Sequence, residues 1–242
     1  KAIQTIKSVI KVKPISNDFI ISNKTINDSY DLEKWDPNII GSNSKSMREL
    51  GFELIIVGRF RKDMDSQTLA SSRVLTLNNE NRSVVGSVDI NINTDFSLKG
   101  SQDYFNSIIL HEFTHILGFS IYHFNEVNNF IESKKIDGIT RFFLKSPKVV
   151  EVAKKYFNCP NIIGVELEEH GNTETAGSHW DARYLLGEYM NGVVYPPEQV
   201  ISEFTLAALE ALGYYKANYY TGGLMQFGKN KGCEFVNQKC II

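Results

Sequence analysis

The segment His111-Glu112-Phe113-Thr114-His115 combines residue types and a spacing that suit a metal-dependent hydrolase. Residues four apart on an α-helix project from nearly the same face, so both imidazoles can bind one metal ion. Glu112 lies between them and can reach a water molecule on that ion, where it can act as a general base. The pattern indicates zinc, which in a catalytic site needs a third protein ligand and an open position for water.

The competing interpretation of this segment is a pair of surface histidines on an ordinary helix. The surrounding sequence argues against it, because the other residues of the predicted helix are largely apolar. They include Tyr104, Phe105, Ile108, Ile109, Phe113, Ile116 and Leu117. A buried helix tolerates a polar block only where its groups are paired or bound to metal. We therefore interpret His111 and His115 as metal ligands and Glu112 as the base.

The third ligand has to come from further along the chain. Gly118, three residues after His115, allows the backbone to turn sharply away from the helix, as in the metzincin branch of zinc peptidases. The commoner metzincin pattern has its third histidine at the position that Ile121 occupies here, so another residue must take this role. Of the histidines, His123 is otherwise expected to be a surface residue and His170 a solvated loop residue. The candidates are His123, His170 and His179, or an acidic ligand among Glu132, Glu151 and Glu166.

Several stretches of the chain resemble the leishmanolysin-like metallopeptidases, metzincins with a long insertion between the glycine and the third histidine. They are VVGSVDINI, SIILHEFTHILGFS, AKKYFNCPNIIGVELEEHGNTETAGSHWDARYLLGEYM, FTLAALEALGYYKANY and GCEFVNQKC, within residues 50–242. The resemblance implies that His179 of GSHWD is the third ligand of a single zinc ion (Zn²⁺). It also implies that Met190 of GEYM forms the Met-turn beneath the metal, for which a plain role in the core is the alternative.

The chain has three cysteines, so at least one thiol has no partner within it. Spacing alone favours a local bridge between Cys233 and Cys240. The resemblance implies instead that Cys159 bonds Cys233, whereas the counterpart of Cys240 pairs with a cysteine of a following C-terminal domain. We therefore expect Cys240 to be unpaired within this chain.

By the same resemblance, the chain is expected to be a zinc-dependent endopeptidase that hydrolyses protein or peptide substrates with a zinc-bound water activated by Glu112. Residues 68–77 are expected to form an edge strand above the cleft, where an extended peptide can pair with the backbone. One alternative is a catalytically inactive cell-surface adhesion or binding module that keeps the fold, against which the intact histidines and Glu112 argue. The other is a zincin with a glutamate ligand, against which Gly118 and GSHWD argue together.

Periodicity and capping residues indicate the elements that position these side chains. Three short apolar runs predict strands of one sheet at 52–60, 68–77 and 84–92, the last with alternating apolar residues. Ser101 or Asp103 is expected to cap the helix that carries HEFTH, and Gly118 to end it.

Further helices are predicted at 146–157, where Ser146 precedes Pro147, and at 198–212. The opening residues predict an amphipathic helix with Ile3, Ile6, Val9 and Ile10 on one face. Residues 22–50, 159–195 and the C-terminal stretch have the composition of irregular structure.

Together these features predict an α+β chain with the zincin or metzincin fold. We expect a twisted mixed sheet with the active-site helix above a loop-rich, mainly helical lower subdomain. Residues 1–119 would be the N-terminal catalytic subdomain, with the sheet and the zinc-binding helix. Residues 120–242 would be the insertion and C-terminal catalytic subdomain, with the third histidine and the Met-turn.

The composition of the chain limits the kinds of partner that we expect it to bind. The net charge is -2, with 26 basic and 28 acidic side chains interleaved, so no basic stripe indicates nucleic acid. No apolar run approaches the roughly 20 residues that cross a bilayer, so we expect membrane association only through segments outside this chain. The Asn-x-Ser/Thr sites at Asn23, Asn27 and Asn81, with the resemblance, favour an extracellular or cell-surface location.

Overall fold

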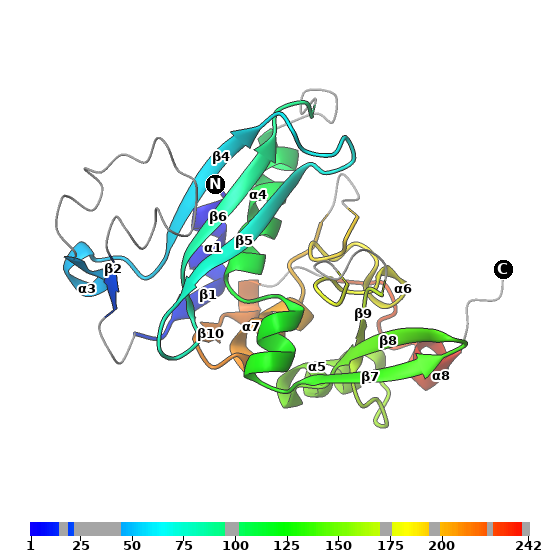
Figure 1. Cartoon of the computed structure of the whole chain (residues 1–242). Helices are drawn as coiled ribbons and strands as arrows, with labels where there is room; N and C mark the ends of the chain where they lie inside the picture. Colours follow the sequence, from blue (N-terminus) through cyan, green and yellow to red (C-terminus); the bar gives the residue numbers. More distant parts are fainter. Residues whose placement is uncertain are drawn as a thin grey trace.

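The computed structural model describes residues 1–14, 19–21, 45–94, 102–169, 176–193, 199–221 and 225–238. Outside these residues lie most of the segment 22–50 and the individual residues Asn23, Asn27, Ser101, His170 and Cys240. Within the described part, helices are combined with small sheets, as the expected α+β class requires (Figure 1). The helices described there include none that is both long and apolar enough to cross a membrane.

A three-stranded mixed sheet forms the upper part of the molecule in Figure 1. Its strands, in spatial order, are β4 (Ile55–Arg61), β6 (Ser83–Asn91) and β5 (Ala70–Leu77). β4 runs parallel to β6, and β5 runs antiparallel to it. Each predicted apolar run therefore contains a strand, and the strand expected at the sheet edge, β5, lies there.

The central strand, β6, confirms the strand predicted at 84–92 and is buried along almost its whole length. Val88 and Ile90 pack against Ile116 of the following helix. Asp89, between them, is partly exposed, and its carboxylate accepts two hydrogen bonds of 2.6 Å from Arg59 of β4.

The helix α4 (Gln102–Ile116) confirms the helix predicted around HEFTH. Asp103 lies inside its first turn and is therefore not its cap. Gly118 follows the helix with a φ of 111°, a conformation that favours glycine. A Cβ atom at Gly86 of β6 would lie 2.5 Å from Ile116 Cγ2, so α4 packs closely against the sheet.

The N-terminal residues pack on α4 through helix α1. The buried face of α1 contains Ala2 and Val9, whereas Ile3, predicted to share it, is 55% exposed. Two pairs of short antiparallel strands connect distant parts of the chain. These elements are α1 (Ala2–Val9), β1 (Ile10–Val12) with β10 (Tyr215–Ala217), β2 (Ile20–Ile21) with β3 (Lys45–Ser46), and α3 (Met47–Leu50).

Residues 120–242 contain a second sheet that the sequence pattern did not predict. It is antiparallel and consists of β7 (Ile131–Ile136), β8 (Ile139–Leu144) and β9 (Val165–Leu167). Most of β7 is exposed, so the β7–β8 hairpin lacks the alternation that marks a half-buried strand. The lower part therefore combines this sheet with several helices, and among its described elements the helices hold more residues than the strands, as expected.

The longer helices of this part begin at capping serines. Ser146 accepts a hydrogen bond from Val149 N and caps α5 (Pro147–Phe157), as predicted. Ser202 caps α7 (Glu203–Ala211), so this helix begins later than the predicted residue 198. The other helices are short and were not predicted: η1 (His123–Val127), α6 (Ala182–Leu185), η2 (Tyr219–Thr221) and α8 (Gly232–Asn237).

A disulfide between Cys159 and Cys233 joins the end of α5 to α8, with the Cα atoms 4.7 Å apart. This confirms the pairing that the family resemblance implied, rather than the local Cys233–Cys240 bridge. Beside it, the rings of Phe157 and Phe235 stack with their centroids 5.7 Å apart. The bridge therefore fixes the C-terminal helix onto the main hydrophobic core.

We expect the double variant Cys159→Ala/Cys233→Ala to lose up to about 4 kcal/mol of unfolding free energy. The bridge closes a loop with a sequence separation of 74, and its removal restores the entropy of that loop to the unfolded chain. Denaturant titration of both proteins measures the difference. Cys240→Ala is the matched control and should keep the wild-type midpoint. An unchanged midpoint in the double variant would contradict the prediction.

Candidate metal centre

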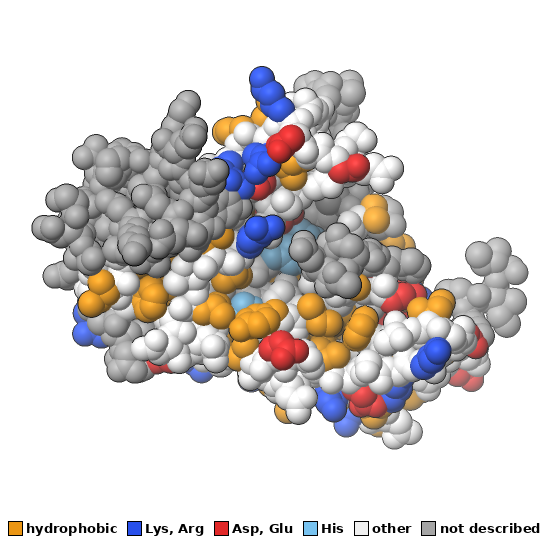
Figure 2. Space-filling model, viewed as in Figure 1, with side chains coloured by type: hydrophobic (Ala, Val, Ile, Leu, Met, Phe, Trp, Pro, Cys, Tyr) orange, Lys and Arg blue, Asp and Glu red, His pale blue; other side chains and the backbone are white. Residues whose placement is uncertain are grey.

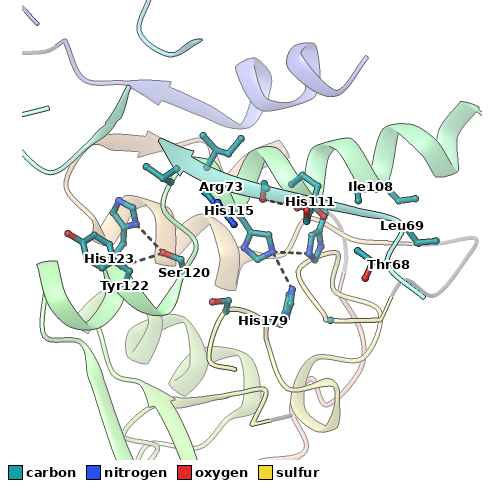
Figure 3. Close-up of a pocket in the computed structure, with 18 of the residues that line it drawn as sticks. Thr68, Leu69, Arg73, Ile108, His111, His115, Ser120, Tyr122, His123 and His179 are labelled. Carbon is teal, nitrogen blue, oxygen red and sulfur yellow. Dashed lines mark hydrogen bonds between the residues drawn. The ribbon is translucent and has the colours of Figure 1, made fainter. Parts of the chain in front are cut away.

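Two histidines from α4 and one from a distant loop meet at the centre of the structure (Figure 3). The Nε2 atom of His115 lies 3.0 Å from that of His111 and 3.2 Å from that of His179. All three ligand atoms lie within 4.8 Å of one another. The described structure thus groups His179, and no other candidate for the third ligand, with the HEFTH histidines.

The opposite nitrogen of each ring faces an oxygen atom. His111 Nδ1 donates to the Tyr189 carbonyl and His115 Nδ1 to the Phe119 carbonyl, both at 2.7 Å. His179 Nδ1 lies 3.0 Å from Oε2 of Glu168. These oxygens favour a proton on Nδ1 of every ring, which leaves a lone pair on every Nε2.

Three lone pairs at such short distances repel one another unless a cation lies between them. Burial lowers the pKa of His111 to about 3 and that of His115 well below its usual value, so both rings are neutral near pH 7. Neutral imidazoles held by outer hydrogen bonds are typical zinc ligands. The donor set therefore fits a zinc ion.

The other candidates for the third ligand lie elsewhere. His123 is 1% exposed, not on the surface as expected, because it lies beneath Gly118 with Nδ1 3.1 Å from Ser120 Oγ. Glu132 pairs with Lys134 and Lys145 on the β7–β8 hairpin, and Glu151 lies on α5. Glu166 binds Arg141 at 2.6 Å, in a separate group with Glu169 and Asp181.

Glu112 is buried beside the histidines, and its Oε2 accepts a hydrogen bond of 2.7 Å from the hydroxyl of Ser72. Burial raises the pKa of Glu112 to about 7, although the Ser72 hydrogen bond acts in the opposite direction. A carboxylate with such a pKa can exchange protons near neutral pH. Ser72 was not predicted as a site residue, although its place in the predicted edge strand was a signal in the sequence.

Met190 is fully buried in a turn that is connected to two of the histidines. Its carbonyl accepts a hydrogen bond of 3.0 Å from the amide of Trp180, the residue after His179. Tyr189, the residue before Met190, supplies the carbonyl that binds His111. The contribution of Tyr189 was not predicted from the sequence, because a contact made by a backbone carbonyl does not depend on the residue type.

A buried carboxylate, that of Glu188, holds this turn from below. It accepts hydrogen bonds from the Met190 amide at 2.5 Å, from Ser202 Oγ at 2.9 Å and from Thr205 Oγ1 at 2.6 Å. Burial raises the pKa of Glu188 to about 7, while these donors lower it. The network fixes the turn to the start of α7, and it too was missed from the sequence.

A cleft of about 1100 Å³ passes over the histidines. Residues 67–77, which include the whole of β5, line one side. The rest is lined by residues of α4, by Ser120, Tyr122 and His123 after it, and by Ser178, His179, Gly192 and Val193. In Figure 2, histidine side chains are visible in a hollow near the centre of this face. The candidate metal centre is therefore open to a molecule from solvent.

The fold and this site together are compatible with a metallopeptidase. The chain belongs to the leishmanolysin family, whose sequence profile matches residues 4–242. This confirms the family that the sequence resembled.

Individual relatives match shorter segments. A leishmanolysin homolog from Crithidia fasciculata is 37% identical over 139 residues, which cover 55% of this chain and 20% of the relative. A leishmanolysin-like peptidase from Drosophila pseudoobscura pseudoobscura is 39% identical over 95 residues, or 39% of this chain and 14% of the relative. Leishmanolysin from Leishmania chagasi is 28% identical over 136 residues, which cover 55% of this chain and 22% of the relative. The chain thus aligns with about a fifth or less of the length of these relatives.

Proposed function

We propose that this chain is a zinc-dependent endopeptidase that hydrolyses peptide bonds in protein or peptide substrates. The proposal depends above all on the convergence of three imidazole lone pairs beside the Glu112 carboxylate, in an open cleft. Membership of the leishmanolysin family supports it, as does the similarity to a Drosophila protein that is named a leishmanolysin-like peptidase.

The free edge of β5 supports binding of an extended peptide. In the described structure β5 pairs with β6 on one side, and its residues line the cleft. A peptide that aligns with this edge can form backbone hydrogen bonds as an added strand, which gives affinity with little sequence preference. On the proposed division, β5 and α4 come from subdomain 1–119 and His179 from subdomain 120–242, so the cleft lies between the two.

In this proposal His111, His115 and His179 hold the zinc ion, and Met190 supports them from the turn below. When bound, zinc supplies a Lewis acid that polarises a carbonyl group and makes water more acidic. The Glu112 carboxylate takes a proton from the attacking water and returns it to the nitrogen of the leaving amine. The C–N bond of the peptide is replaced by a C–O bond, and Glu112 is again an ionised carboxylate at the end of the reaction. Ser72 binds Oε2 of Glu112, so Oε1 would be the oxygen that takes the proton.

An oxidising environment fits the proposed extracellular or cell-surface location. The Cys159–Cys233 disulfide is of the kind that persists outside the cytosol. Of the three Asn-x-Ser/Thr sites, the one at Asn81 lies within the described residues. Asn81 is exposed in the turn between β5 and β6. An attached glycan at this position would face solvent.

Metal removal tests the proposed function directly. We expect purified protein to contain close to one zinc per chain and to digest casein. Treatment with 1,10-phenanthroline should abolish digestion, because the three histidines hold the metal on which the reaction depends. Addition of zinc after dialysis should restore it, whereas addition of magnesium, which prefers oxygen ligands, should not.

The same experiment distinguishes the peptidase from the competing interpretation, an inactive binding module. A zinc-loaded protein that leaves casein intact would support an inactive binding module instead. Full digestion by protein shown to be free of metal would contradict the zinc-dependent mechanism.

A further inference from the structure

The cleft contains very little charge apart from its histidines. Among the described residues that line it, Glu112 is the only carboxylate and Arg73 the only lysine or arginine. Glu112 is buried and bound to Ser72. Arg73 is exposed, and its side chain has no ion pair or hydrogen bond with the described part of the chain. Its positive charge is therefore available to a molecule in the cleft.

Arg73 lies on the strand that contacts the proposed base, Glu112. It follows Ser72 on β5, and the Ser72 hydroxyl binds Glu112 of the candidate site. Adjacent residues of a strand point to opposite faces, so Arg73 does not share the contact that Ser72 makes with Glu112. A peptide residue paired with Arg73 would have its Cβ atom about 4.5–5.5 Å from that of the arginine, one position away from the residue paired with Ser72.

We propose that Arg73 determines substrate specificity by selecting an acidic side chain within two residues of the scissile bond. The inference rests on the proposed peptidase function and names a class of substrate for it. An acidic side chain would find in Arg73 a planar donor that can bind both carboxylate oxygens. It would meet no competing carboxylate among the described lining residues except Glu112, which is already bound.

A second interpretation of Arg73 has to be separated from this one. Charged residues on edge strands often prevent two sheets from pairing edge to edge. That role predicts aggregation when the charge is removed and no change in the choice of substrate. The specificity role predicts a change in the choice of substrate in the soluble protein.

The test uses fluorogenic peptides derived from one casein sequence that the zinc-loaded protein cleaves. Glu, Gln or Lys is placed in turn at each of the three positions before and after the scissile bond. We expect a three- to tenfold higher kcat/KM for Glu than for Gln at one position within two residues of the bond, and the lowest value for Lys. This preference should weaken at high salt, because the arginine is exposed.

Substitutions assign the preference to Arg73. Arg73→Gln should bring the Glu to Gln ratio to about one, Arg73→Lys should keep part of it, and Arg73→Glu should reverse it in favour of Lys. Lys216→Gln is the matched control, since it removes an exposed positive charge from β10, outside the cleft. This variant should keep the wild-type ratio.

The outcomes separate the inference from the function on which it rests. Cleavage without an acidic preference, or a Glu to Gln ratio that survives in Arg73→Gln, overturns the role of Arg73 and leaves the peptidase standing. Aggregation of Arg73→Gln with an unchanged ratio in its soluble fraction supports the edge-strand role instead. A zinc-loaded chain that cleaves neither casein nor any peptide overturns both proposals.

Discussion

Glu112→Gln is expected to lower kcat by roughly 10²- to 10⁴-fold, the range typical of a lost general base. The amide has nearly the shape of the carboxylate and can still accept the hydrogen bond of Ser72, but it cannot take a proton from water. Zinc content and the unfolding midpoint should stay at their wild-type values, because Glu112 is a base and not a ligand in the proposed mechanism. Peptide cleavage, metal analysis and thermal melting of the same preparation check the three quantities.

Glu126→Gln provides the matched control for this variant. Glu126 is an exposed residue of η1 that does not line the cleft, so its substitution makes the same chemical change away from the site. It should leave kcat unchanged. Cleavage by Glu112→Gln at close to the wild-type rate would show that another group takes the proton. Loss of zinc from Glu112→Gln would show that the carboxylate contributes to holding the metal.

The elements that were predicted correctly carry their signals within a few residues. The apolar periodicity around HEFTH and the pair Ser146-Pro147 lie inside or beside the helices that they define. The β7–β8 hairpin was missed because its exposed strand carries Glu132, Lys134 and other polar residues on both faces. A pattern based on burial cannot detect a strand that is largely exposed.

The contacts that position the site residues could not be predicted from such local signals, because they join residues far apart in the sequence. Ser72 and Glu112 are 40 residues apart, and Glu188 and Thr205 are 17 apart. A serine in an edge strand and a glutamate in a loop-like stretch look like ordinary solvated residues in the sequence. Only folding brings them to the partners that make their burial favourable.

The third histidine shows the same limit. His179 lies 64 residues beyond His115, and the residue pattern alone left several candidates open. The resemblance to a family selected one of them, and the geometry groups that residue with the HEFTH histidines. The role of His179 as a ligand remains a prediction that metal binding can test.

His179→Ala is expected to weaken zinc binding by more than about 100-fold, with a parallel loss of peptidase activity. The substitution removes one of three nitrogen donors, which is a larger loss than that of an outer partner, typically about 10- to 100-fold. Glu168, whose carboxylate lies 3.0 Å from His179 Nδ1, is such an outer partner. Glu168→Gln should therefore show the smaller effect. Competition with a zinc-binding dye measures the affinity of both variants.

His123→Gln is the decisive comparison for this prediction. His123 also follows the HEFTH helix and also lines the cleft, but it lies outside the group of three histidines. Since its ring is buried, the variant should lose some stability while retaining zinc affinity, and circular dichroism shows whether each variant is folded before zinc is measured. Added zinc should restore activity to Glu168→Gln at moderate concentration, but should restore little to His179→Ala. A folded His179→Ala that keeps wild-type affinity, or a folded His123→Gln that loses it, would show that the third ligand has been assigned to the wrong residue.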